Sequence, residues 1–193
     1  MRPLTHDDLL SLEDYARQRA GFRARVMAHK RDRTIHVGEH VTLLFEDRLT
    51  IQYQVQEMLR AERIIEAEGI AGELAAYNPL VPDGRNLKCT MLIEYVDVGE
   101  RKWKLHELRG IEQCVAIEVA GHQPVIAVAD EDLPRSNEKK TSAVHFLRFE
   151  FDDAMAAAAR AGAAVTARID HPSYAASAVL SDAQRVSLAA DFD

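Results

Sequence analysis

The chain has 193 residues, of which 47% are apolar and 28% are charged, and its formal net charge at pH 7 is −7. This composition is ordinary for a globular protein and excludes a disordered or fibrous chain. The longest aliphatic run, VIAVA at 125–129, is too short to cross a bilayer, and the start MRPLTHDDLL lacks the apolar segment of a secretory signal. We therefore expect a cytoplasmic protein that does not contact the membrane.

The two cysteines exclude several kinds of site. Cys89 and Cys114 lie 25 positions apart, and the chain has no CxxC pair. A disulfide framework, a zinc knuckle and an iron–sulfur cluster all need more cysteines or closer spacing. We expect no bound cofactor and no electron transfer by the chain itself.

The first predicted elements are helices around a short hairpin. A capping box formed by Thr5 and Asp8 opens a helical region that extends to residue 33. The runs TIHV and HVTLLFE then form a hairpin with a loop at 38–40, because this loop places Val37 opposite Val41 and matches the apolar faces. A regular helix is expected over 48–68, and a second helical piece continues to Tyr77.

The rest of the chain alternates strands and helices after the turn NPLVPDG at 78–84. A strand at 87–95, a helix at 97–109 and a strand at 114–120 predict a βαβ unit with two parallel strands. Further strands are expected at 123–130, 142–151, 164–170 and 174–180. Further helices are expected at 152–162 and from 181 onwards.

This order of elements predicts an α+β fold with a mixed, mainly antiparallel sheet covered on one face by helices. The whole chain, residues 1–193, is expected to be a single domain. Residues 1–77 would form a helix-rich N-terminal layer, and residues 85–193 a sheet-rich part.

Two polar residues occupy positions where apolar residues are expected. His145 stands in the more apolar row of the strand that contains HFLRFEF, and Glu62 falls on a helical stripe with apolar residues. A buried ionised carboxylate must be paired, protonated or bound to metal. We expect a hydrogen-bonded core residue at His145, and at Glu62 a salt bridge to an arginine or an edge of the stripe that reaches water. The alternative is that Glu62 and His145 form a catalytic acid–base couple or a metal site. The stripe consists of Ile51, Val55, Met58, Leu59 and Ile65.

Other sites have weaker support. His122 and His171 lie in predicted turns, and Asp130 and Asp132 lie near a strand end, so a metal site is conceivable there. Their spacing matches no known ligand pattern, and we expect no metal. The nucleotide, serine-hydrolase and zinc-protease motifs are absent, which favours a protein that is not an enzyme.

The charge is distributed unevenly along the chain. Residues 17–33 hold seven Lys or Arg and one Asp, so the remainder carries −13. On a helix Arg19, Arg23 and Lys30 would share one side and form a basic patch, whereas the other cations scatter. The segment would bind an acidic partner, nucleic acid or the acidic helices of the chain itself. Nucleic acid is the weakest of these alternatives, because no stacking aromatics accompany the cations beyond Phe22.

Four stretches together resemble a bacterial domain family of unknown function along nearly the whole chain: TLLFEDRLTIQYQVQEMLRAERI, AYNPLVPDGRNLK, ADEDLPRSNEKKTSAVHFLRFEF and DHPSY. The resemblance implies genes that accompany rubrerythrin and a heterodisulfide-reductase-like iron–sulfur protein. It therefore implies a role near redox or peroxide metabolism and identifies no catalytic residue. We expect an accessory or interaction protein, a homodimer, that serves a redox partner. A small metal- or ligand-binding enzyme is the alternative.

Overall fold

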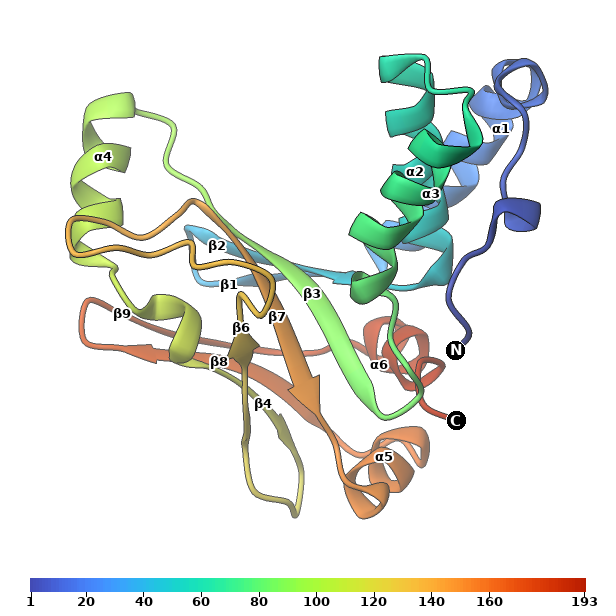
Figure 1. The fold of residues 1–193 in the computed structure, drawn as a ribbon. Coiled ribbons are helices and arrows are strands. Elements are labelled where there is room, and N and C mark those ends of the chain that lie inside the picture. Colours follow the sequence, from blue (N-terminus) through green and yellow to red (C-terminus); the bar gives the residue numbers. More distant parts are fainter.

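The computed structural model describes all 193 residues as an α+β protein, which confirms the predicted fold class. It contains six α-helices and nine strands (Figure 1). The helices are α1 (Leu12–Arg31), α2 (Arg48–Glu62), α3 (Ala67–Tyr77), α4 (Val98–Glu107), α5 (Asp153–Arg160) and α6 (Asp182–Ala189). The strands are β1 (Thr34–Val37), β2 (Val41–Glu46), β3 (Asn86–Ile93), β4 (Val115–Val119), β5 (Val125–Ile126), β6 (Val128–Ala129), β7 (Val144–Glu150), β8 (Val165–His171) and β9 (Tyr174–Val179). None of the helices combines the length and the apolar composition that crossing a bilayer requires.

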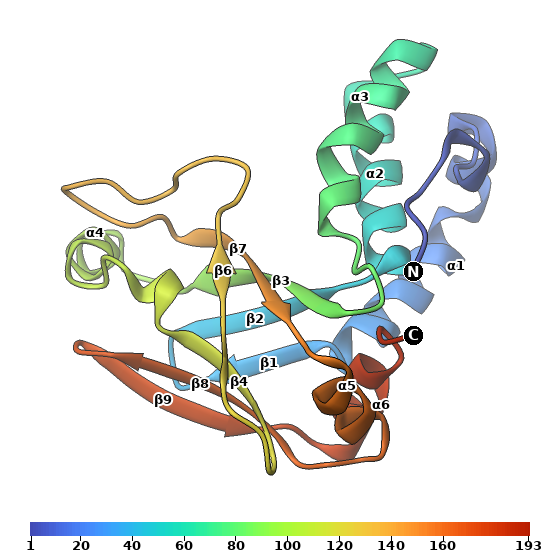
Figure 2. The same cartoon turned by 60° about the horizontal axis from the view of Figure 1, so that its bottom comes forward.

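The strands form two antiparallel sheets that face each other across the main core (Figure 2). One sheet has the order β1-β2-β3-β7-β6, and the other has the order β5-β4-β8-β9. The inward side chains of both sheets contribute to a core of 29 buried residues. Only the buried Ala127 separates β5 from β6, so this bent segment passes from one sheet to the other. A β-strand with alternating apolar residues buries one face, and here the opposite sheet covers that face.

The parallel βαβ pair predicted from the sequence is wrong. Every strand pair is antiparallel, and β3 and β4 belong to different sheets because α4 carries the chain across the core. The sequence analysis also expected helices to cover one face of the sheet. In the structure the apolar faces of the two sheets pack mainly on each other. The hairpin register is confirmed, with Val37 opposite Val41. The Tyr174 hydroxyl joins the two sheets at this hairpin, donating to the Val37 carbonyl at 2.7 Å.

The helices α1, α2 and α3 form a layer with a small core of its own, which consists of Leu4, Ile51, Val55, Leu59 and Val81. Two side-chain amides hold the N-terminal segment against this layer. Gln56 bonds both the N–H and the carbonyl of Leu10, and Asn78 does the same for Leu4. The helix predicted over 48–68 is interrupted, because α2 ends at Glu62 and Arg63 adopts a left-handed conformation with φ of 56°.

A buried guanidinium joins the end of α1 to the sheet and to the C-terminal segment. Arg33 is only 1% exposed and donates at 3.0 Å to the carbonyls of Phe45, Glu46 and Ser187. It also donates to the carboxylate of Asp191, which is itself 1% exposed. Because these partners come from β2, α6 and the residues after α6, one side chain connects three parts of the chain.

Replacing Arg33 should therefore destabilise the protein strongly. Arg33→Met leaves the Asp191 carboxylate buried without its cation, and we expect the free energy of unfolding to fall by about 3–5 kcal/mol. Arg31→Met changes an exposed arginine two positions earlier and should cost less than about 0.5 kcal/mol. Urea unfolding followed by circular dichroism measures both. Equal losses for the two variants would contradict this role of Arg33.

The stability should also depend on pH through Asp191. Burial raises the pKa of this carboxyl from 3.8 to about 6, although Arg33 acts in the opposite direction. A raised native pKa stabilises the fold below pH 3.8, and this contribution is lost as the pH rises through 6. Between pH 4 and pH 7 the free energy of unfolding of the wild type should fall by up to about 3 kcal/mol relative to that of Asp191→Asn, whose side chain does not titrate. Urea unfolding of both proteins at intervals of one pH unit tests this, and a difference independent of pH would refute it.

Candidate functional site

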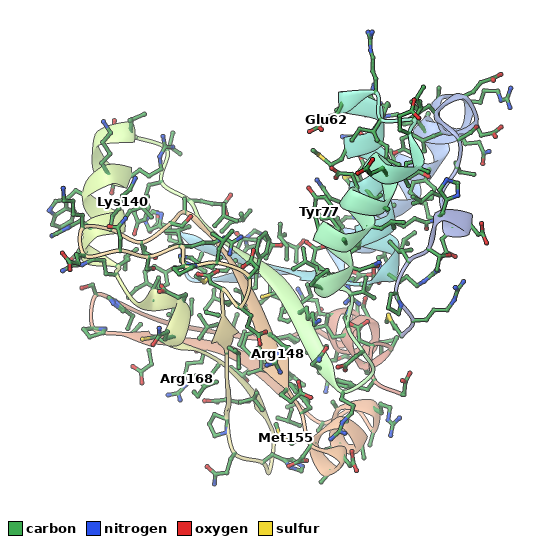
Figure 3. The ribbon with its side chains drawn as sticks, in the orientation of Figure 1. Glu62, Tyr77, Lys140, Arg148, Met155 and Arg168 are labelled. Atoms are coloured by element: carbon green, nitrogen blue, oxygen red, sulfur yellow. The ribbon has the colours of Figure 1, made fainter.

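A pocket of about 270 Å³ lies between the end of α3 and the outer face of the β3–β7 pair. In Figure 3, Tyr77 marks the end of α3 and Arg148 marks β7. All of the lining residues come from two segments, 76–88 and 131–148. They are Ala76, Tyr77, Pro79, Leu80, Lys88, Glu131, Asp132, Phe146, Leu147 and Arg148.

The local structure explains why these residues meet. Asn78–Leu80 is a single 3-10 turn that follows α3 directly, with Pro79 in its first turn, and it brings this part of the chain beside β3. In the antiparallel pair Lys88 stands opposite Arg148, and Thr90 stands opposite Phe146. Because Leu87, Cys89 and Met91 point into the core, the alternate residues of β3 point outward.

The two cations of the pocket have different partners. Arg148 donates to both oxygens of Glu131 at 2.8 and 2.9 Å and to Glu150 at 2.6 Å. These bonds from Arg148 lower the pKa of Glu131. The Lys88 ammonium donates at 2.5 Å to the carbonyl of Pro79, and no carboxylate lies within 4.0 Å of it. Burial lowers the pKa of Lys88, whereas the nearby carboxylates of Asp83, Glu131 and Glu150 act in the opposite direction.

Arg135 connects the rim of the pocket to the interior. It donates to both oxygens of Asp132, and these bonds lower the pKa of Asp132 to about 2. The same guanidinium lies 4.4 Å from the centre of the Phe146 ring and 3.4 Å from the carboxylate of Asp130. Arg135 therefore holds the loop at 130–143 against β7.

A sealed polar network lies behind this loop, with His145 at its centre. His145 is 0% exposed, and its Nδ1 lies 2.6 Å from Asp130 Oδ2. Its Nε2 lies 2.8 Å from the Thr141 hydroxyl and 3.9 Å from Glu112. Ser136 and Thr141 donate to Glu112 at 2.7 and 3.2 Å. Both ring nitrogens of His145 therefore have partners inside the protein.

The alternative in which Glu62 pairs with His145 is not formed. Glu62 is exposed at the end of α2 that lies far from the sheets (Figure 3). The helical-wheel argument is wrong because it assumed that the helix continues to Ile65, which is 69% exposed. The partners of His145 are instead Asp130, Thr141 and the Ser142 carbonyl.

The four metal-ligand candidates do not gather at one place. His171 uses both ring nitrogens internally, accepting from the Ser173 N–H and contacting the Arg109 carbonyl at 3.0 Å. Asp130 bonds His145, and Asp132 bonds Arg135, whereas His122 lies in the turn after β4. No group of three or more His, Cys, Asp or Glu side chains is arranged to hold a metal ion.

The predicted basic patch is partly neutralised by the protein itself. Arg19 donates to both oxygens of Glu57 at 2.7 and 2.8 Å, and Tyr15 donates to the same carboxylate. Arg23 is exposed and Lys30 is half-buried, and neither forms an ion pair. Of the three alternatives for this segment, pairing with the acidic residues of the chain accounts for Arg19.

Apart from Asp132, the sequence does not single out the pocket residues, because those on the strands resemble an ordinary solvent-facing row. Lys88, Thr90 and Arg148 alternate with buried residues as they would on any half-exposed strand. One signal was present, since NPLVPDG forces the chain to turn immediately before Lys88. The position of α3 over that row depends on packing between distant segments, which the pattern does not show.

The fold and site define a two-sheet α+β protein with a helical layer, an open pocket and a separate sealed charge network. The chain belongs to the family described as Protein of unknown function (DUF3501), whose model matches residues 3–192. A crystal structure of a novel protein of unknown function from Burkholderia pseudomallei K96243 is similar, with 50% identity and a TM-score of 0.94. The similarity covers 100% of both chains. No curated protein matches the chain.

Loss of His145 should destabilise the protein rather than remove an exposed reactive group. His145→Leu leaves Asp130 and Glu112 buried without the imidazole, and we expect a loss of about 3–5 kcal/mol in the free energy of unfolding. The control His122→Leu changes a half-buried turn residue and should cost less than about 1 kcal/mol. Urea unfolding measures both losses. A His145→Leu variant as stable as the wild type would show that the network is not structural.

Proposed function

We propose that the protein is a non-catalytic accessory protein of the bacterial cytoplasm that contacts a partner in redox or peroxide metabolism. The redox context rests on the resemblance to the family. The non-catalytic role is supported by one observation above others, the burial of the histidine and the threonine hydroxyl at the centre of the polar network. His145 is 0% and Thr141 is 1% exposed, so a substrate cannot reach either group.

The cysteines support a role other than thiol chemistry. Burial raises the pKa of Cys89 well above its usual value of 9.0, and burial also raises the pKa of Cys114. The thiolate is the reactive form of cysteine, and both environments disfavour it. Neither thiol is therefore suited to carry reducing equivalents for a partner.

Exposed apolar residues near α4 provide a surface for contact with a partner. Trp103 is 58% exposed, and Val96 and Val98, at the start of the same segment, are 100% and 53% exposed. Figure 1 shows α4 at the opposite end of the molecule from α1, α2 and α3. Tryptophan is enriched among the residues that contribute most to protein interfaces.

Crosslinking in cells tests this function. The wild type, Trp103→Ala and Val186→Ala would be expressed at native level, with and without sublethal peroxide, and crosslinked proteins identified by mass spectrometry. Val186 is 72% exposed on α6 and serves as the control. We expect a redox protein to crosslink to the wild type and to Val186→Ala, and at least about tenfold less to Trp103→Ala.

Two results would contradict the proposal. One is that no redox protein is crosslinked to the wild type under either condition, and the other is that Trp103→Ala crosslinks as strongly as the wild type. The proposed homodimer is tested on the same proteins by light scattering, where a monomeric mass would exclude it. Elemental analysis without a histidine tag tests the metal-binding form of the enzyme alternative, which a stoichiometric metal ion would support.

A further inference from the structure

We propose that the pocket at the end of α3 binds a small monocarboxylate with an apolar body. The carboxylate would pair with the ammonium of Lys88, and the apolar body would pack against Tyr77, Leu80 and Phe146. This inference is independent of the accessory role, because the pocket and the partner surface at α4 have no lining residue in common.

Lys88 has free hydrogen-bonding capacity. An ammonium has three donors, and the only bond from Lys88 goes to the carbonyl of Pro79. The side chain is half-buried, and its remaining donors have no partner in the protein. A ligand carboxylate placed beside Lys88 would accept the remaining hydrogen bonds.

The charges around Lys88 limit the charge of the ligand. Arg148 is already paired with Glu131 and Glu150, and Asp132 is paired with Arg135. Lys88 is therefore the only charged side chain of the lining without an ion pair. A ligand with one carboxylate would form that ion pair, whereas a dianion such as phosphate would bring excess negative charge close to Asp83, Glu131 and Glu150, whose charges already act on Lys88. A cationic ligand would be repelled by Lys88.

The size and the lining of the pocket limit the rest of the ligand. The pocket volume of about 270 Å³ corresponds to roughly nine water molecules in the liquid, at about 30 Å³ each. This is just below the usual range of small-molecule sites, so a nucleotide is too large. Half of the lining residues are apolar and come from both walls, the end of α3 and β7, which suits a short aliphatic chain or a single aromatic ring between them.

The test is a titration with 3-phenylpropionate and hexanoate followed by two-dimensional amide NMR. The neutral 3-phenylpropionamide, which has the same apolar body, is the control ligand. We expect both acids to give saturable shifts at residues 76–80, 86–90 and 144–148, and the amide to bind at least tenfold more weakly. Lys88→Met should weaken acid binding at least tenfold, and Lys102→Met, at an exposed position on α4, should not.

A second pair of variants keeps the test decisive if Lys88→Met does not fold. Ala76 lines the pocket from an exposed position on α3, so Ala76→Phe should fill the pocket and abolish binding without disturbing the core. Ala75→Phe, at the exposed neighbouring position that does not line the pocket, should bind as the wild type does. The proposal is wrong if neither acid gives saturable shifts at these residues, if the amide binds as tightly, or if Ala76→Phe leaves binding unchanged.

Discussion

The burial of Arg33 constrains the arrangement of the whole molecule. A guanidinium that is 1% exposed must have all its donors satisfied, and here the partners come from β2, α6 and the C-terminal residues. The helical layer follows the same constraint, because α1 leads directly into Arg33 and α2 follows β2. Because α3 packs on α2, one wall of the pocket belongs to this helical layer.

The polar groups of the interior have more hydrogen-bond partners than the lysine of the pocket. In the interior, Arg33 and His145 each lie among carboxylates and carbonyls that balance them, which leaves little capacity for a ligand. At the pocket, Lys88 has a single carbonyl partner. A histidine–acid cluster is often read as a sign of catalysis. Here the buried cluster holds a loop in place, and the side chain with unused hydrogen-bond donors is the half-buried Lys88 at the pocket.

The sequence predicted local features well and long-range ones poorly. The alternation in TIHV and VTLLFE determined the hairpin register, and the same rule placed His145 on a buried face. The prediction of a βαβ unit was wrong because helical and strand periodicities do not specify which of two sheets a strand joins. The prediction that Glu62 lies on a buried helical stripe was wrong because a helical wheel cannot show where a helix ends. Arg63, which ends α2, is not a residue that usually adopts a left-handed conformation. Lys88 was missed because its environment is created by α3, which lies far from β7 in sequence.

The central claim is that the Arg33 contacts couple the helical layer, the sheets and α6 into one cooperative unit, as the single-domain prediction requires. Native-state hydrogen exchange of the wild type and Arg33→Met measures this coupling amide by amide. In the wild type we expect α1, α2, α6 and the central strands to exchange with one common free energy of opening. In Arg33→Met the helices should open at a lower free energy than β3, β4, β7 and β8. Unchanged protection of α1, α2 and α6 in the variant would contradict the account.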